Sequence, residues 1–299
     1  MLHLLNGEAT LAVFPPKLPG ERAVWRDIMV EGPAVDDGAE RGAWLAPWLG
    51  VAPEEYQQRW REGQALLTRA GGDDVVLWFE QDLFCAVNLW FVVARLPLRT
   101  PLWLVFPPLS APCAGLATLP ASELTELFES RRRLDRDARG EADRLWRAYA
   151  AADPTVLART RSPLTFADDA IRLHLGRFPS AAHGLNETET ATLRALVAGP
   201  RPFAELFRDV THAPAHHRHG MGDVQYAAIV RELRPLIAVD DVATPCSTWR
   251  VTLTDLGAAV LEGRLDGLAA RTLERWLGGV HLRPGEPSWR WDGEQLVPP

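Results

Sequence analysis

The side chains best suited to chemistry in the first 110 residues are carboxylates that follow short apolar segments. Asn6-Gly7-Glu8, Arg26-Asp27 and Glu80-Gln81-Asp82 each come directly after such a segment. Carboxylate oxygens are the ligands that Mg²⁺ and Mn²⁺ prefer, and a second carboxylate beside the ion can activate water for hydrolysis or group transfer. We therefore expect Asp27, Glu80 and Asp82 to be catalytic, and Glu8, Asp27 and Glu80 to hold a metal ion. The ligand-binding residues that we expect are Asn6, Gly7, Glu8, Arg26, Glu31 and Ser110.

The same residues also have a plain structural explanation. Polar residues follow the strands of every α/β protein because the connecting loops face water. Glu8 or Asp82 could cap the next helix, since a carboxylate accepts hydrogen bonds from the exposed N–H groups of a first turn. The sequence leaves both explanations open for each residue.

Four apolar segments are expected to form the strands that position these residues, at Leu2–Leu5, Ala23–Trp25, Val75–Phe79 and Leu102–Phe106. Residues 83–96 predict a helix between the last two, which completes a strand–helix–strand unit with parallel strands. Residues 41–70 predict further helix, broken at Pro47 and Pro53. The fold class expected is an open, Rossmann-like, mostly parallel α/β sheet, in which ligands bind at the carboxyl ends of the strands.

Changes of pattern along the chain predict three parts. Residues 1–118 are expected to form the α/β domain, residues 119–182 a helical linker, and residues 183–299 a winged-helix domain with a tryptophan-rich tail. The last assignment depends on three helices, two strands at 236–239 and 249–253, and a closing helix at 253–263. The charged run 129–144 is interpreted as the solvated face of a helix.

A winged helix often binds DNA, and Arg231 and Arg234 are the arginines of the expected recognition helix. Between Glu187 and Glu294 the chain has 15 acidic side chains against 12 arginines and no lysine, a poor electrostatic footprint for DNA. The net charge of −7 also argues against a partner held by phosphate contacts. Two alternatives to an enzyme remain. One is a transcriptional regulator whose α/β domain senses a ligand. The other is a non-catalytic module that contacts a protein partner, or a second copy, through its tryptophan-rich tail. Trp249, Trp276, Trp289 and Trp291 indicate an aromatic-rich core or an interface.

Other candidate motifs carry less weight. His212, His216, His217 and His219 are dense enough to bind zinc, but Pro214 prevents the helix that would align them, which favours a solvated loop. The signatures of serine hydrolases, P-loop NTPases, dinucleotide dehydrogenases and zincins are absent. Three cysteines without a C-x-x-C pair, no secretion signal and no membrane-spanning segment predict a cytoplasmic protein without a membrane partner.

Several segments spread over nearly the whole chain form a recognisable set. They are His3-Leu4-Leu5-Asn6-Gly7-Glu8, Trp25-Arg26-Asp27, residues 76–82, Arg177-Phe178-Pro179-Ser180, Gly222-Asp223, residues 276–282 and residues 289–292. As a set they resemble a bacterial family catalogued as domain of unknown function 1835. The resemblance implies a bacterial origin and the domain order given above, and it implies no particular activity.

Overall fold

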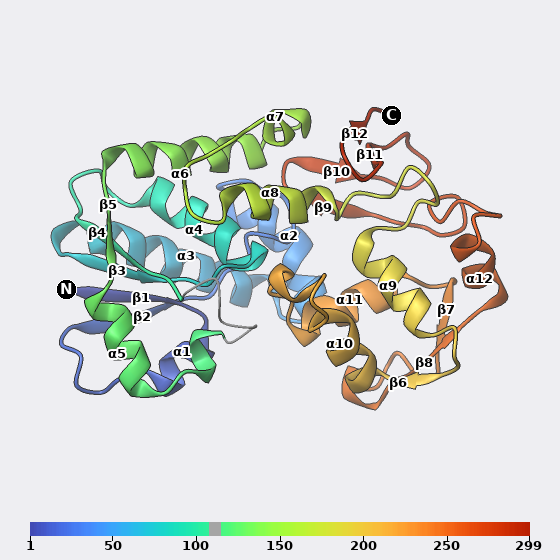
Figure 1. The fold of residues 1–299 in the computed structure, drawn as a ribbon, viewed down its shortest axis with the longest axis horizontal. Helices are drawn as coiled ribbons and strands as arrows, with labels where there is room; N and C mark the ends of the chain where they lie inside the picture. The colour runs from blue at the N-terminus through green and yellow to red at the C-terminus, as the bar shows by residue number, and fades with distance from the viewer. Residues whose placement is uncertain (108–114) are drawn as a thin grey trace.

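A five-stranded sheet organises the amino-terminal half of the computed structural model, which describes residues 1–107 and 115–299. Its strand order is β2-β1-β3-β4-β5, the first four strands are parallel, and β5 is antiparallel to β4 (Figure 1). The expected mostly parallel α/β sheet is therefore confirmed. The strands are β1 (Leu2–Asn6), β2 (Glu21–Trp25), β3 (Val75–Trp78), β4 (Leu102–Val105) and β5 (Arg132–Leu134).

Helices cover both faces of the sheet, which explains why its central strands are continuously apolar. On one face α3, α4 and α6 share a core with Leu4 and Leu77, and on the other face α1 and α5 share a core with Leu5 and Trp78. All four of these strand side chains are fully buried. The helices are α1 (Glu8–Val13), α2 (Gly38–Leu49), α3 (Pro53–Arg69), α4 (Leu83–Arg95), α5 (Ala121–Glu129) and α6 (Arg136–Tyr149).

Two local predictions in this half are corrected. Helix α2 continues through Pro47 and ends at Gly50, so the expected break occurs only before Pro53, which begins α3. The charged run 129–144 is not one helix, because residues 132–134 form the edge strand β5. Arg131, just before β5, lies over the rings of Trp103 and Phe128, at 5.1 and 4.1 Å, so charged residues attach this edge through aromatic contacts.

The carboxy-terminal unit has its own core and its own small sheet. Its sheet is antiparallel with the order β6-β8-β7, and three of its helices pack around Leu193, Leu206, Tyr226 and Trp249. Its elements are α9 (Glu187–Ala195), β6 (Arg201–Pro202), α10 (Phe203–Thr211), α11 (Asp223–Glu232), β7 (Ile237–Val239), β8 (Arg250–Leu253) and α12 (Asp255–Leu261). The helices α7 (Thr155–Ala158) and α8 (Ala167–Leu175) connect the two halves.

The apolar side chains of the two hairpins in the tail pack on the amino-terminal half. These hairpins are β9 (Arg275–Leu277) with β10 (Val280–Leu282) and β11 (Arg290–Trp291) with β12 (Leu296–Val297). Leu277, Leu282 and Trp291 belong to the same core as α4 and α6. Gly278, in the turn between β9 and β10, sits so close to the end of α6 that a Cβ would lie 2.3 Å from the Tyr149 carbonyl oxygen. The packing thus joins residues 273–291 to the α/β core.

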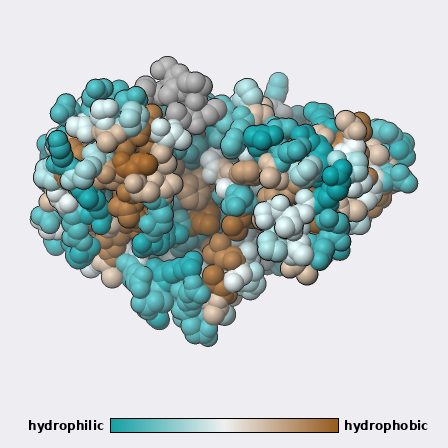
Figure 2. Space-filling view, turned by 90° about the horizontal axis from the view of Figure 1, so that it is seen from below, coloured by the Kyte–Doolittle hydropathy of each residue, from teal (hydrophilic) through white to brown (hydrophobic). Residues whose placement is uncertain are grey.

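Viewed from below, hydrophobic surface gathers in the hollow between the two halves (Figure 2). A crevice of only about 20 Å³ lies at the junction, lined in part by Glu31, Trp48, Arg177 and Gln225. The halves are therefore closely packed there. Within the described residues, no helix has both the length and the apolar character needed to cross a membrane.

Candidate functional site

The strand order places the carboxyl ends of β1 and β3 next to each other at the edge of the sheet where the parallel strands end. From β1 the chain passes outward to β2 on one side and then crosses to β3 on the other. Connections that leave in opposite directions open a crevice between adjacent strands, and ligands of open α/β sheets bind in that crevice. Asn6 ends β1 there, and Glu80 and Asp82 follow β3.

Three potential ligand atoms meet at this position. The carboxylates of Glu80 and Asp82 and the thiol of Cys85 lie within 4.8 Å of one another. Among residues 1–107 and 115–299 this is the one set of three acidic, histidine or cysteine side chains that is close enough to hold a metal ion. We call it the acidic–thiol group (Glu80, Asp82 and Cys85).

Local hydrogen bonds fix the acidic–thiol group. Asp82 is the N-cap of α4 and accepts a bond of 2.7 Å from the backbone N–H of Cys85, so the capping role considered for Asp82 is confirmed. Glu80 accepts a bond of 2.7 Å from the backbone N–H of Leu116. Neither carboxylate forms an ion pair within the part of the chain that the structure describes, which leaves their negative charges without a cationic partner.

Burial and mutual repulsion disfavour the ionised forms. Burial, with the nearby charge of Glu80, raises the pKa of Asp82 to about 7. Burial also raises the pKa of Glu80, and the bond from Leu116 opposes that shift only in part. The pKa of the Cys85 thiol is raised well above its usual value by burial and by the two carboxylates, which keeps the sulfur protonated at neutral pH. A cation bound here would relieve this repulsion.

Two asparagines connect the acidic–thiol group to the end of β2. The Asn6 amide donates to the Cys85 sulfur at 3.0 Å, and the Asn88 amide donates to the Asn6 side-chain oxygen at 2.8 Å and to the Asp27 carbonyl at 3.1 Å. Asn88 is fully buried in α4, and its side-chain oxygen accepts from the Met29 N–H. Sequence reasoning missed Asn88 as a site residue. The sequence feature that could have indicated Asn88 is that it is the one amide side chain within the apolar run 83–94.

Asp27 is held by a buried arginine that the sequence analysis did not select. Arg41, which is 0% exposed, donates to Asp27 at 2.9 Å and to the Pro33 carbonyl at 2.6 Å. The Tyr56 hydroxyl donates to the same carboxylate at 3.0 Å. Burial opposes the charge of Arg41, but Asp27 and Tyr56 keep its pKa raised. The hydrogen-bonding capacity of Asp27 is thus largely used inside the fold.

The expected metal set of Glu8, Asp27 and Glu80 is not brought together. Glu8 is exposed and pairs with Arg26 at 2.6 Å, while Asp27 pairs with Arg41. Glu80 alone belongs to the acidic–thiol group. The correction has a simple cause, because arginines from neighbouring elements reach the first two carboxylates. Gly7, the N-cap of α1, forms no side-chain cap bond, and α1 has only six residues.

Of the two remaining ligand-binding candidates, Glu31 belongs to the described residues. Glu31 accepts bonds from Arg177 at 2.8 Å and from Gln225 of α11 at 3.1 Å, so it joins the two halves of the molecule. Ser110 lies outside the described residues. Glu31 therefore contributes to the contact between the two halves and does not belong to the acidic–thiol group.

The histidine segment is more buried than its sequence suggests. His212 is exposed, but His219 is 4% exposed, and its pKa is lowered to about 3, first by burial and then by Arg177. The rings of His216 and His219 stack at 6.1 Å. No set of three histidines converges among the described residues. The solvated-loop interpretation therefore fails for His219.

Helix α11 uses two of its faces for packing. Tyr226 belongs to the carboxy-terminal core, and Gln225 is buried against Glu31. Arg231 and Arg234 are exposed, and the Arg231 guanidinium lies 4.8 Å from the centre of the Trp249 ring. The helix is accordingly fixed between two units.

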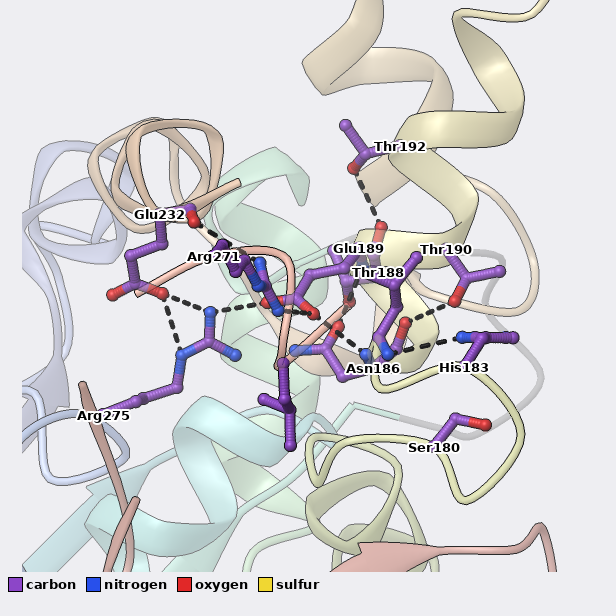
Figure 3. A network of polar contacts seen from close by, with 12 residues as sticks. Ser180, His183, Asn186, Thr188, Glu189, Thr190, Thr192, Glu232, Arg271 and Arg275 are labelled. Carbon is purple, nitrogen blue, oxygen red and sulfur yellow. Dashed lines mark hydrogen bonds and ion pairs between the residues drawn. The ribbon is translucent and has the colours of Figure 1, made fainter. Parts of the chain in front are cut away.

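A buried ion-pair network secures the tail. Glu189 of α9 lies between Arg271 and Arg275, 2.7 Å from each, and Arg275 also pairs with Glu232 of α11 (Figure 3). Burial alone would raise the pKa of Glu189, but the two arginines lower it to about 2. The capping box of Asn186 and Glu189 aligns the carboxylate at the start of α9. The network joins α9, α11 and the segment that leads into β9.

No protein-family model matches the sequence, and no curated protein is similar to it. A fold by itself does not define a function, because one architecture serves many chemistries. The function must therefore be argued from the acidic–thiol group and its surroundings.

Proposed function

We propose that the chain binds a small polar ligand together with a divalent cation at the acidic–thiol group. The observation that carries this proposal is that three ligand atoms lie within 4.8 Å at the carboxyl ends of β1 and β3. The thiol stays protonated because its pKa is raised, so the carboxylate oxygens are the main ligands. Oxygen ligands favour Mg²⁺ or Mn²⁺, which keep several water molecules when bound.

The chemistry that this site favours is hydrolysis or group transfer, with a nucleotide or another phosphate compound as the ligand class. Glu80 holds the cation, and Asp82 accepts the proton of an attacking water molecule. A carboxylate beside the cation is suited to this role, because a bound cation favours the ionised form that can accept a proton. Asn6 orients the site through the Cys85 sulfur and through Asn88.

Thermal unfolding with added cations tests the proposal. We expect Mg²⁺ or Mn²⁺ to raise the melting temperature of the full chain at pH 8, and a nucleotide to raise it further. Saturation at a hundred times the Kd adds about 2.7 kcal/mol. Glu80→Gln should abolish the shift, and the control Glu8→Gln should retain it, since Glu8 forms an exposed ion pair with Arg26 and does not belong to the acidic–thiol group. A wild-type chain that responds to no cation would contradict the proposal.

The carboxy-terminal unit is, in this proposal, a winged helix used for packing. The order α9, β6, α10, α11, β7, β8 supports this assignment. DNA binding through Arg231 and Arg234 is disfavoured, because Gln225 of α11 would have to give up its hydrogen bond to Glu31 for the helix to enter a groove. The tail is also a poor interaction module, since Trp291 is buried in the α/β core. The bacterial family resemblance, the cytoplasmic location and a homodimer remain predictions.

A further inference from the structure

A cavity lies along the outer edge of the sheet, and no residue of the acidic–thiol group lines it. Its volume is about 310 Å³. Residues 21–28, in and after β2, form one wall, and α3 between Tyr56 and Arg69 forms the opposite wall. Ligand pockets run from roughly 300 to 1,000 Å³, so this cavity suits one small molecule.

Aromatic rings that are held in place by their neighbours line the cavity. Trp25, Tyr56 and Trp60 all contribute to it. Gly38 approaches Trp60 so closely that a Cβ would lie 2.3 Å from the indole ring, and Arg41 lies 5.7 Å from its centre. Trp25 and Tyr56 are buried, whereas Trp60 is partly exposed, so Trp60 is the immobilised ring on which another ring can stack.

The edge of β2 supplies a hydrogen-bond donor and acceptor. β2 is the outermost strand, and the Glu21 N–H donates to the Met1 carbonyl on the β1 side. Because successive residues of a strand direct their backbone groups to opposite sides, the N–H and C=O of Val24 point away from β1. No other described strand pairs with this edge. Val24 itself lines the cavity.

The charges around the cavity largely cancel. Arg26 pairs with Glu8, Arg59 with Glu55 and Arg69 with Glu21, at 2.5 to 2.7 Å. Asp27 pairs with Arg41. A neutral ligand is therefore favoured over an anion, since Arg26, Arg59 and Arg69 already pair with carboxylates, and Arg22, which also lines the cavity, donates to the backbone carbonyls of Pro15 and Pro16.

We propose that this cavity binds a small, neutral, planar heteroaromatic molecule with an amide-like edge, of the nucleobase class. The ring stacks against the aromatic wall, while its adjacent donor and acceptor pair with the C=O and N–H of Val24. The site is independent of the acidic–thiol group. Hydrogen bonds through Asp27, Asn88 and Asn6 connect it to that group.

Calorimetric titration of the full chain with uracil and adenine tests the inference, with benzyl alcohol as a ring that lacks the amide-like edge. We expect both bases to bind, and benzyl alcohol to bind roughly tenfold more weakly, the effect of about one good hydrogen bond. Leu66→Trp fills the cavity and should abolish base binding. The control Ala65→Trp places the same ring at an exposed position of α3 outside the cavity and should leave binding unchanged.

A second pair of variants tests the strand edge. Val24→Pro removes the outward N–H without deleting a bond to β1, because proline is tolerated where the N–H of an edge strand faces outward. Val24→Ala keeps the N–H and removes the two γ-methyl groups that Val24→Pro replaces with its ring. Base binding roughly tenfold weaker in Val24→Pro than in Val24→Ala is the expected result. If Leu66→Trp fails to fold, this pair decides alone. Absence of base binding to wild type, equal binding of benzyl alcohol, or displacement only by an extended peptide would overturn the inference.

Discussion

Gly220 of the carboxy-terminal unit packs directly on the carboxyl group of Asp82 at the start of α4. A Cβ at Gly220 would lie 2.5 Å from the Asp82 Cγ, and the φ of Gly220 is +63°. The segment that contains the histidines therefore extends to the edge of the sheet where the parallel strands end. This contact couples the two halves of the molecule at the proposed cation site.

Gly220→Ala should destabilise the chain by about 2 kcal/mol or more, because the methyl group meets the Asp82 carboxylate and left-handed backbone adds roughly 1 kcal/mol. Gly50→Ala is the matched control. Gly50 has a φ of +70° with nothing within 4 Å of its Cβ position. Gly50→Ala should therefore lose only the roughly 1 kcal/mol that the left-handed backbone costs a residue with a side chain. Urea unfolding at pH 7 measures both. Equal losses in the two variants would show that the Gly220 contact carries no energy.

Asp82→Asn should stabilise the chain at pH 8 and leave it nearly unchanged at pH 4. The pKa of Asp82 is about 7 in the folded chain against 3.8 as its ordinary value, so stability falls as pH rises between these values. Each pKa unit corresponds to roughly 1.4 kcal/mol, and the total is on the order of a few kcal/mol. Asparagine is also a good N-cap. Urea unfolding from pH 4 to 8 checks the slope, and a variant with the wild-type slope would exclude Asp82 as its source.

Arg41→Met should destabilise the chain by roughly 3 to 5 kcal/mol, because it leaves the buried Asp27 carboxylate unpaired. Arg59→Met is the control, since its ion pair with Glu55 is about half exposed and such pairs contribute roughly 0 to 1 kcal/mol. Adding Asp27→Asn to Arg41→Met should recover part of the loss. Chemical denaturation of the wild type, Asp27→Asn, Arg41→Met and the double variant gives the coupling energy. A small loss in Arg41→Met would contradict the structural role given to Asp27.

Glu189→Gln should weaken the attachment of the tail and cost roughly 3 to 5 kcal/mol, since two buried arginines lose their shared carboxylate. The pKa of Glu189 is lowered from 4.5 to about 2. Its contribution is therefore complete above pH 4.5 and is lost as the pH falls toward 2. Limited proteolysis near residues 264–275, compared between pH 7 and pH 3, follows the tail directly. Unchanged proteolysis in Glu189→Gln at pH 7 would argue against this network as the anchor.

The sheet could be predicted because β1, β3 and β4 are short apolar runs with no periodicity, as buried parallel strands require. β5 could not be predicted, because the sequence Arg132-Arg133-Leu134 contains no apolar run. It is a strand because it pairs with β4, which is a tertiary contact. The tail could not be placed either, because Leu277 and Trp291 can pack on any apolar surface and the sequence does not specify which.

The site was predicted in part. Polar residues after β1 and β3 indicated the right edge of the sheet, and Glu80 and Asp82 do meet there. The partners of Glu8 and Asp27 were missed, because Arg41 in an amphipathic helix has the same pattern as a solvated arginine. Tertiary contacts alone distinguish a buried ion pair from a pair of free charges.

Calorimetric titration of Mn²⁺ into the full chain at pH 6 and pH 8 tests the central claim most directly. Cation binding favours ionised Asp82, so we expect one site with tighter binding at pH 8, proton release at pH 6, and loss of the heat in Glu80→Gln but not in Glu8→Gln. A titration with no binding heat at either pH, or with the same heat in Glu80→Gln as in the wild type, would contradict the account.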